Sequence, residues 1–359
     1  MRAGVRVGTA VAIASIAIAG SIGTAGAATG GDAPGLKAAV DKLKQDVTRL
    51  EKGLQAKGIR TETGNSLLDT GSGSRAGCTP GALLGWADQL KKAMSETEQQ
   101  GSDLLGSLAF DYAGSVAEQG PDQKFGTDGQ YTGQSTKTMD KLRSFWDIQS
   151  KDIQLVPAHG TDLADSAKVT KLFSLVDGAE QAKTDAADVR SVLTKIPELK
   201  NGRNPVLTFN AYSAPGPDKR IELGDGILDA AAKFGFGSIG VPVVLAHEYG
   251  HQNQFANNYA ASGPALEMGA DAFSGYFVTH PNGMGFDSAT QGKANELSSS
   301  IGDCQDDHGS PQQRSAATQW GEKQYADQQD PKAIRPSAEF ITAWQKEFPV
   351  LHPDGARKS

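Results

Sequence analysis

The stretch VLAHEYGHQNQF, residues 244–255, decides which fold and which chemistry this sequence predicts. It holds His247 and His251 four residues apart, with Glu248 directly after the first histidine. Pro242 lies just upstream, and proline fits the first turn of a helix, so we expect a helix through this stretch. On a helix the two histidines share one face and can reach a single ion. The pattern His-Glu-x-x-His is typical of zinc sites in which the glutamate acts as general base on the metal-bound water.

A catalytic zinc site needs a third protein ligand and an open fourth position. A third histidine of the metzincin kind would require a glycine at position 254 and a histidine at position 257, but the sequence has Gln254 and Asn257. The segment PALEMGADAFSGYFVTH, which starts at residue 264, offers Glu267 and, one helical turn later, Asp271. We therefore expect Glu267 to be the third ligand. Asp271 would accept the outer N–H of a ligand histidine and so fix its tautomer.

The alternative interpretation of this second segment is a surface helix with two solvated acids. Most of its other residues argue against that, because they are apolar: Leu266, Ala270, Ala272, Phe273 and Phe277. Buried acids need partners, and a metal with its histidine provides them. Gly250 fits the same arrangement, since glycine inside a helix costs about 1 kcal/mol relative to alanine. We expect this glycine to let the second helix, or a strand, approach closely beside the ion.

Three blocks of the sequence resemble the neutral zinc metallopeptidase family of bacteria. AHEYGHQNQF (246–255) is similar to the family's A-H-E-x-G-H-H-x-Q, and LEMGADAFSGY (266–276) to its E-L-Q-A-D helix. SIGDCQDDHGSPQQRSAATQWG (300–321) is similar to its I-G-D, H-G-[ST] and Q-R elements. Because the blocks follow one another in the family's order, they are far more specific than the first alone. The resemblance covers residues 205–327.

This resemblance implies a gluzincin-like peptidase whose general base is Glu248 and whose zinc ligands are His247, His251 and Glu267. Two departures from the family pattern are Gln252, where the family has a second histidine, and Met268-Gly269, where it has Leu-Gln. Neither departure touches an inferred ligand, so both bear on the substrate groove instead of on the metal.

His308 is the candidate for a second catalytic group. The intermediate of peptide hydrolysis carries an oxyanion, and a donor aimed at such an oxygen contributes about 10²–10³ in rate. In DDHGSPQQR, Ser310 suits an N-cap, Pro311 the first helical position and Gln313 a capping box, so His308 would be held at a fixed helix start. Asp306–Asp307 beside it would orient the imidazole or keep it protonated. The alternative is a histidine that only hydrogen-bonds in the loop or positions the helix.

The first 27 residues predict a signal peptide. Arg2 and Arg6 precede a run of small and apolar residues that closes on Ala25-Gly26-Ala27, a suitable cleavage site. A single membrane anchor is the alternative, but Gly20 and Gly23 interrupt an alanine-rich run, whereas a span needs about 20 strongly apolar residues. We therefore expect a secreted, extracellular protein with no membrane segment after cleavage.

The chain carries a formal net charge of −7 and no basic clusters. This balance argues against nucleic acid or anionic lipid as a partner. The two cysteines, Cys78 and Cys304, would lie in an oxidising compartment, so we expect one long-range disulfide between them. Two separate buried thiols are the alternative, and the spacing is too long for a zinc knuckle.

Before residue 205 the pattern predicts helices joined by loops. Between residues 36 and 54 apolar residues recur at alternating spacings of four and three, which predicts a helix that packs on another helix. We expect TGSGSRAG (70–77) to be a linker, 118–135 a loop, and further helices at 82–94, 139–146, 169–176 and 186–196. DIQLVPAHG (152–160) predicts a short strand ended by Pro157, followed by His159 as a solvated loop residue.

After residue 205 the pattern changes to strands. VLTFNAYSA (206–214) is rich in β-branched and aromatic residues, and KRIEL (219–223) could pair with it across a PGPD turn. The expected fold is therefore α+β and mainly helical, with a zincin-like catalytic domain and a helical N-terminal region. The domain order is a signal peptide (1–27), an N-terminal helix and linker (28–76), a mostly helical region (77–204) and a zinc metallopeptidase catalytic region (205–359).

We expect a secreted peptidase that holds one Zn²⁺ ion and binds a peptide or protein substrate extended along 206–214. One alternative is a catalytically inactive, zinc-stabilised scaffold; the other is a cell-wall hydrolase acting on peptide cross-links. Glu248 argues against the scaffold, because structural zinc sites need no base and favour closed, cysteine-rich ligand sets. No recognisable wall-binding repeat supports the hydrolase. For the helix at 36–54 we expect binding of a protein partner or autoinhibition, and no part in zinc binding.

Overall fold

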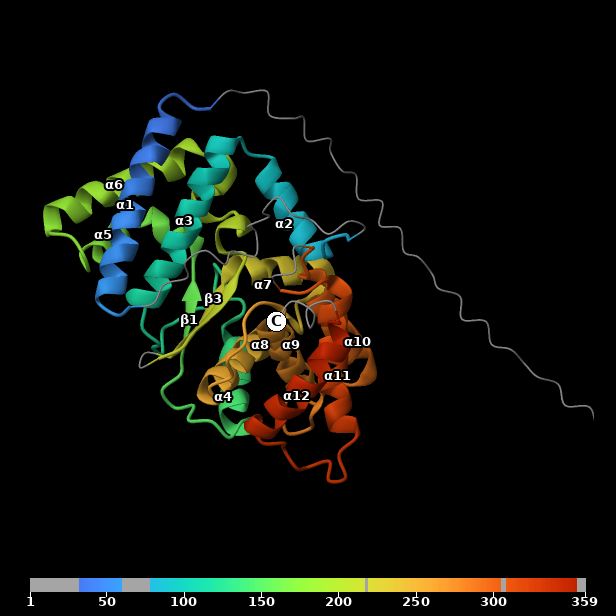
Figure 1. Cartoon of the computed structure of the whole chain (residues 1–359). Helices are drawn as coiled ribbons and strands as arrows, with labels where there is room; N and C mark the ends of the chain where they lie inside the picture. The colour runs from blue at the N-terminus through green and yellow to red at the C-terminus, as the bar shows by residue number, and fades with distance from the viewer. Residues whose placement is uncertain (1–31, 60–77, 217–218, 305–307, 354–359) are drawn as a thin grey trace, which may run out of the picture.

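The computed structural model describes residues 32–59, 78–216, 219–304 and 308–353, which Figure 1 draws in colour. The expected signal peptide, the linker 70–77 and Asp306–Asp307 lie outside these residues. The described chain is mainly helical with one small sheet, which confirms the α+β class. None of its helices combines the length and the apolar character that crossing a membrane requires.

Helices make up most of the described chain. The part before residue 205 contains α1 (Leu36–Ala56), α2 (Ala82–Lys92), α3 (Glu96–Ser115), α4 (Thr132–Phe145), β1 (Gln154–Ala158), α5 (Ser166–Phe173) and α6 (Ala179–Lys195). The later part contains β2 (Ala211–Ala214), β3 (Arg220–Gly224), α7 (Asp225–Ala231), α8 (Gly240–Ala256), α9 (Pro264–Thr279), α10 (Ser288–Ser300), α11 (Pro311–Ala326) and α12 (Ser337–Leu351). Short 3₁₀ turns and one π turn join them at Gly160–Ala164, Pro197–Gly202, Pro205–Thr208 and Ala232–Phe236.

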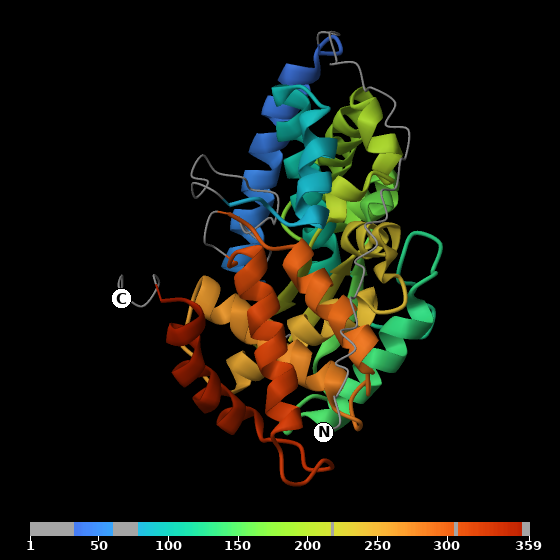
Figure 2. The same ribbon diagram turned by 90° about the vertical axis from the view of Figure 1, so that its right-hand side faces the viewer.

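The predicted N-terminal helix is confirmed as α1, and its apolar seam is buried inside the chain. The seam residues are at most 2 % exposed: Leu36, Val40, Leu43, Val47, Leu50 and Leu54. α1 packs on α3 and α6, at the end of the molecule away from α10 to α12 (Figure 2). Burying one such side chain contributes about 1.5–3 kcal/mol, so the seam stabilises this helical end. Because the chain itself covers the apolar face of α1, only the polar face is available to a protein partner.

The predicted hairpin is confirmed, and a third strand joins it. β2 pairs antiparallel with β3, and β1 pairs parallel with the other side of β3, so the strand order is β1-β3-β2. The first half of the predicted strand 206–214 was wrong, because Pro205–Thr208 form a 3₁₀ turn. Pro205 occupies the first position of that turn, and the Asn204 side chain accepts the N–H of Val206.

The prediction that Pro157 ends the first strand was also wrong, since β1 continues to Ala158. The N–H of Gln154 donates to Lys219 O beside β3, whereas the N–H of Leu155 donates to the Gln119 side chain outside the sheet. Residues of a strand alternate in this way, so Pro157 faces the open edge with Leu155. An edge strand tolerates proline there because no ladder hydrogen bond is lost.

His159 is not the solvated loop residue that we expected. Its Nδ1 lies 2.7 Å from Oδ2 of Asp225, the first residue of α7, and its side chain is 16 % exposed. Burial lowers the pKa of His159, but the Asp225 carboxylate outweighs burial and the net shift is upward. The pair ties the end of β1 to the start of α7, and local sequence could not show a partner so far along the chain.

The sheet crosses the domain boundary that we placed at residue 205. β1 and α4 come before that boundary, yet β1 pairs with β3 and α4 packs against α8. α3 packs against β1 and β3, whereas α8 packs against β2 and β3 from the other face (Figure 1). The sheet therefore joins the N-terminal helices to the helices that carry the predicted metal site.

Three helices of the later part pack backbone against backbone through glycines. A Cβ atom on Gly250 of α8 would lie 2.9 Å from Ala270 Cα of α9, which confirms that this glycine permits a close approach. A Cβ atom on Gly275 of α9 would lie 2.1 Å from Thr318 O of α11. Larger residues at these positions would push the helices apart. The glycines therefore set how the side chains of α8, α9 and α11 are positioned relative to one another.

Candidate metal centre

The structure brings together the three residues that the sequence predicts as metal ligands. His247 Nε2 lies 3.4 Å from Glu267 Oε2, and His251 Nε2 lies 3.5 Å from Glu267 Oε1. One ligand atom from each residue lies within 4.8 Å of the others. The histidines come from successive turns of α8 and the glutamate from the first turn of α9. Two imidazole nitrogens and a carboxylate are a donor set that suits zinc.

Hydrogen bonds to the outer nitrogens orient both imidazoles. His247 Nδ1 lies 2.8 Å from Asp271 Oδ1, and His251 Nδ1 lies 2.8 Å from Gln254 Oε1. When Nδ1 is occupied in this way, Nε2 is left to face Glu267, which is the arrangement that supports a metal-ligating histidine. Asp271 lies where the sequence placed it, and Gln254 is a partner that we did not predict.

The charged groups around the three ligand atoms favour binding of a cation. Burial lowers the pKa of His247, but Asp271 and Glu267 outweigh burial and raise that pKa to about 10. Burial raises the pKa of Glu267, but the two imidazoles outweigh it and hold that pKa well below its usual range. The carboxylates thus stabilise positive charge on the imidazoles, and a metal ion placed between the three ligands would supply that charge instead.

Arg314 is a further residue of the site that sequence reasoning missed. Its Nε and Nη2 donate to the two oxygens of Asp271 at 2.8 and 2.9 Å, and Arg314 is 1 % exposed. The residue belongs to α11, which packs against α9 across Gly275. The Q-R element of the third sequence block includes Arg314 and was a signal for this residue. The separation of Arg314 and Asp271 in the sequence gives no indication that they are in contact.

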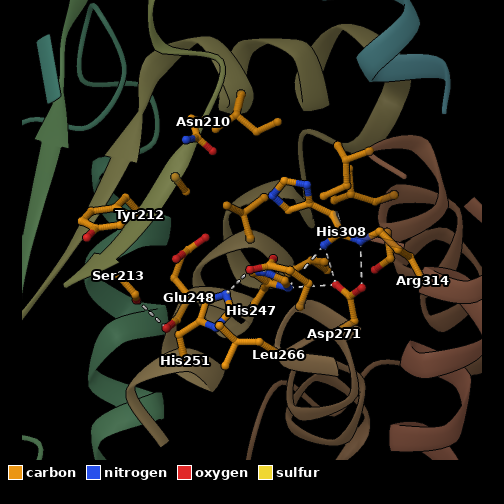
Figure 3. A pocket seen from close by; sticks show the side chains of 18 of the residues that line it. Asn210, Tyr212, Ser213, His247, Glu248, His251, Leu266, Asp271, His308 and Arg314 are labelled. Carbon is orange, nitrogen blue, oxygen red and sulfur yellow. Dashed lines mark hydrogen bonds and ion pairs between the residues drawn. The ribbon is translucent and has the colours of Figure 1, made fainter. Parts of the chain in front are cut away.

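Glu248 lies beside the ligands on the wall of a cavity (Figure 3). Burial raises the pKa of Glu248, and the neighbouring imidazoles only partly oppose that shift. A raised pKa suits a group that accepts and then returns a proton near neutral pH. Ser213 of β2 donates its hydroxyl to the backbone oxygen of Glu248 at 2.6 Å, which fixes α8 against the sheet.

His308 lines the same cavity, just before α11. The predicted capping box is confirmed, because Ser310 and Gln313 bond to each other's backbone N–H and Pro311 occupies the first helical position. The orienting aspartate is Asp303, whose Oδ2 lies 2.9 Å from His308 Nδ1 and accepts the backbone N–H of His308 at 3.1 Å. Asp306–Asp307, to which we gave this orienting role, lie outside the described residues.

The predicted disulfide is present between Cys78 and Cys304. It joins the residues before α2 to the segment that follows α10, one residue after Asp303. The Gly81 N–H also donates to Gly302 O at 2.9 Å. The disulfide therefore fixes the segment from which Asp303 holds His308.

The two departures from the family pattern lie outside the cavity. Gln252 is 2 % exposed and donates to Ala214 O and Arg220 O, so it fixes the sheet against α8. Met268 is fully buried, and a Cβ atom on Gly269 would lie 2.8 Å from Trp344 Nε1. None of the three is among the described residues that line the cavity, so these departures affect packing and not the groove.

A second group of carboxylates has other partners. Asp46, Asp185 and Asp188 also lie close enough together to hold an ion. Lys42 and Arg49 already neutralise them: Lys42 contacts Asp46 and Asp188, and Arg49 contacts Asp46 and Asp185. This group is a network of ion pairs between α1 and α6.

Comparisons of the chain with protein-family models, curated proteins and solved structures find no match. The resemblance to zinc metallopeptidases consequently rests on the three blocks of sequence.

Proposed function

We propose that this chain is a secreted zinc-dependent peptidase of the gluzincin-like kind, with a zincin-like catalytic region. The observation that carries the proposal is the meeting of His247, His251 and Glu267 within 4.8 Å of one another, beside Glu248 on the wall of one cavity. A purely structural zinc site has no use for Glu248, and it favours closed ligand sets with cysteine. The only cysteines of this chain are joined to each other.

The three ligands would hold one Zn²⁺ ion, which supplies Lewis-acid activation of a water and of the substrate carbonyl. Glu248 accepts the proton that the water loses as its oxygen attacks the carbonyl carbon, and passes it to the leaving amine as the C–N bond breaks. His308 donates a hydrogen bond to the oxyanion. Asp271 and Arg314 act on the imidazole of His247, which they hold in one tautomer.

The edge of β2 is the surface on which we place the peptide substrate. The Gly224 N–H donates to Asn210 O, so alternate residues of β2 bond to β3, whereas Ala211 and Ser213 turn their backbone N–H and C=O groups away from it. Both residues line the cavity. An extended peptide can add to this edge as a further strand, with main-chain hydrogen bonds that are independent of its sequence.

The test compares the mature protein with Glu248→Gln, measuring bound zinc and cleavage of an unfolded protein such as casein. We expect the variant to keep one equivalent of zinc and to lose cleavage. His308→Ala should also keep its zinc, and its kcat should fall about 10²–10³-fold with little change in KM. A Glu248→Gln protein that cleaves as fast as the wild type would refute the mechanism. A wild-type protein that binds zinc but cleaves nothing would favour the inactive scaffold.

A further inference from the structure

The disulfide between Cys78 and Cys304 lies at the end of the segment that holds His308. Cys304 is the last residue of segment 301–304, which follows α10. Its neighbour Asp303 contacts His308 twice, because one carboxylate oxygen accepts the backbone N–H at 3.1 Å and lies 2.9 Å from the imidazole Nδ1. A displacement of Asp303 would therefore displace the imidazole on the wall of the cavity.

The other end of the disulfide is attached to the residues directly before α2, a helix that belongs to the core. Three residues of α2 are at most 3 % exposed: Leu83, Leu84 and Ala87. The N–H of Gly81, which precedes α2, donates to Gly302 O, and a Cβ atom on Gly81 would lie 2.2 Å from Ser300 O. The disulfide thus ties segment 301–304 covalently to a fixed helix, and with two cysteines in the whole chain no other disulfide can take its place.

The residues that would hold the metal are positioned in another way. His247 and His251 belong to α8 and Glu267 belongs to α9. These two helices pack directly on each other at Gly250, where a Cβ atom would lie 2.9 Å from the Ala270 Cα. The ligand set therefore does not depend on the disulfide, whereas the position of His308 does.

We propose that the disulfide is a redox switch of the peptidase: it holds His308 in place when the cysteines are oxidised and releases it when they are reduced. The inference rests on the proposed function, in which His308 donates a hydrogen bond to the oxyanion. The reduced chain folds and binds zinc but turns over slowly, and it gains full activity when the disulfide forms. A cell that makes this peptidase and exports it would be protected from it until export.

Reduction of the disulfide starts at Cys78. This residue is partly exposed, whereas Cys304 is 6 % exposed, and thiol exchange depends on which sulfur can be reached. A thiolate of a small dithiol attacks the Cys78 Sγ, the S–S bond breaks, and Cys304 leaves as a thiolate that takes up a proton. The second thiol of the dithiol then displaces Cys78. The chain gains two electrons and two protons, and the dithiol becomes a cyclic disulfide.

The test compares casein cleavage and bound zinc in the oxidised protein and in protein reduced with dithiothreitol, freed of it without air and reloaded with zinc. We expect reduction to lower kcat about 10–100-fold, because a group displaced by about 1 Å loses most of its effect. Bound zinc should stay at one equivalent, and reoxidation should restore kcat. A variant with Cys78→Ser and Cys304→Ser should match the reduced protein and should not respond to dithiothreitol.

Two variants separate the switch from a loss of stability. In His308→Ala, reduction should lower kcat no further, because the effect of the disulfide acts through His308. Leu43→Ala is the matched control, since Leu43 is fully buried in α1 and its truncation destabilises the fold by an amount comparable to loss of a disulfide. Its kcat should equal that of the wild type at a temperature where both are folded.

Hydrogen exchange in Glu248→Gln gives a measurement that does not depend on cleavage. Reduction should speed exchange of the Asp303 N–H, which donates to Gly309 O, and of the His308 N–H, and should leave the amides of α8 unchanged. Full activity after reduction, an equal loss in His308→Ala, or loss of zinc would overturn the inference and leave the peptidase intact. If the oxidised, zinc-loaded wild type cleaves nothing, the proposed function fails. Unchanged exchange of both amides overturns the switch whether or not the protein cleaves casein.

Discussion

Replacing Arg314 by methionine tests whether the ion pair beneath the ligand set is as important as its geometry suggests. Methionine roughly keeps the length of the side chain and removes its charge. Asp271 would then stay 2 % exposed, with the contact to His247 and without the two hydrogen bonds from the guanidinium. Breaking a buried pair by removing one partner typically costs about 3–5 kcal/mol.

The protonation of Asp271 sets a ceiling on this cost. Burial raises the pKa of Asp271, but Arg314 and His247 outweigh burial and hold the pKa below its usual value. The wild-type pair thus contributes stability that is present above the usual pKa and is lost as the pH falls through the folded-state value. In the variant Asp271 keeps only its contact to His247, and the carboxyl can limit the cost of losing Arg314 by taking up a proton, at about 1.4 kcal/mol per pH unit above about 3.9. The ceiling is therefore about 4 kcal/mol at pH 7 and about 1.5 kcal/mol at pH 5.

The assay is urea unfolding of the chelator-treated protein, with its disulfide intact, at pH 7 and pH 5. We expect Arg314→Met to lose about 3–4 kcal/mol of unfolding free energy at pH 7 and about 1.5 kcal/mol or less at pH 5. Arg314→Lys keeps the charge but cannot donate to both oxygens, so its loss should be smaller at both pH values. A loss below about 1 kcal/mol at pH 7, or an equal loss at both pH values, would refute the reasoning.

Three further outcomes follow from the contacts described above. Glu267→Ala should abolish tight zinc binding and Asp271→Asn should weaken it about 10–100-fold, measured by equilibrium dialysis; the reverse order would exchange the two roles. Replacing both Cys78 and Cys304 by serine should lower the unfolding free energy by about 2–4 kcal/mol, and an unchanged urea midpoint would contradict a stabilising disulfide. Burial raises the pKa of Glu322 to about 7, so the folded state binds its proton more tightly and wild-type stability falls as the pH rises from about 4.5 to 7. Glu322→Gln should therefore be more stable than wild type by about 1 kcal/mol at pH 8, after allowance for solvent screening, and no more stable at pH 4.5; equal gains at both would exclude this cause.

Local pattern was sufficient wherever a feature depends on neighbours in sequence. The spacing of apolar residues predicted α1, and the order of Ser310, Pro311 and Gln313 predicted the start of α11. His247 and His251 could be placed on one face because a helix has a fixed period. The local pattern gave wrong predictions at Pro157 and His159. Pro157 lies within an edge strand, and His159 pairs with Asp225, which is far away along the chain.

The length of the chain and its charge could not show which residues far apart in the sequence come into contact. Asp303 contacts His308, which we did not predict, and β1 joined the sheet from outside the expected catalytic region. Both contacts join parts of the chain whose meeting depends on how whole elements pack.

The sequence by itself therefore determined the histidine helix, the acidic helix after it, the hairpin and the two cysteines, because periodicity and short-range spacing specify these features. Only the tertiary structure decided that Glu267 faces both imidazoles, that Arg314 contacts Asp271, and that Glu248 and His308 line one cavity with the ligands. The physical reason is that α8, α9 and α11 pack through glycines, and the offset between helices is a property of their contact, which no single segment encodes.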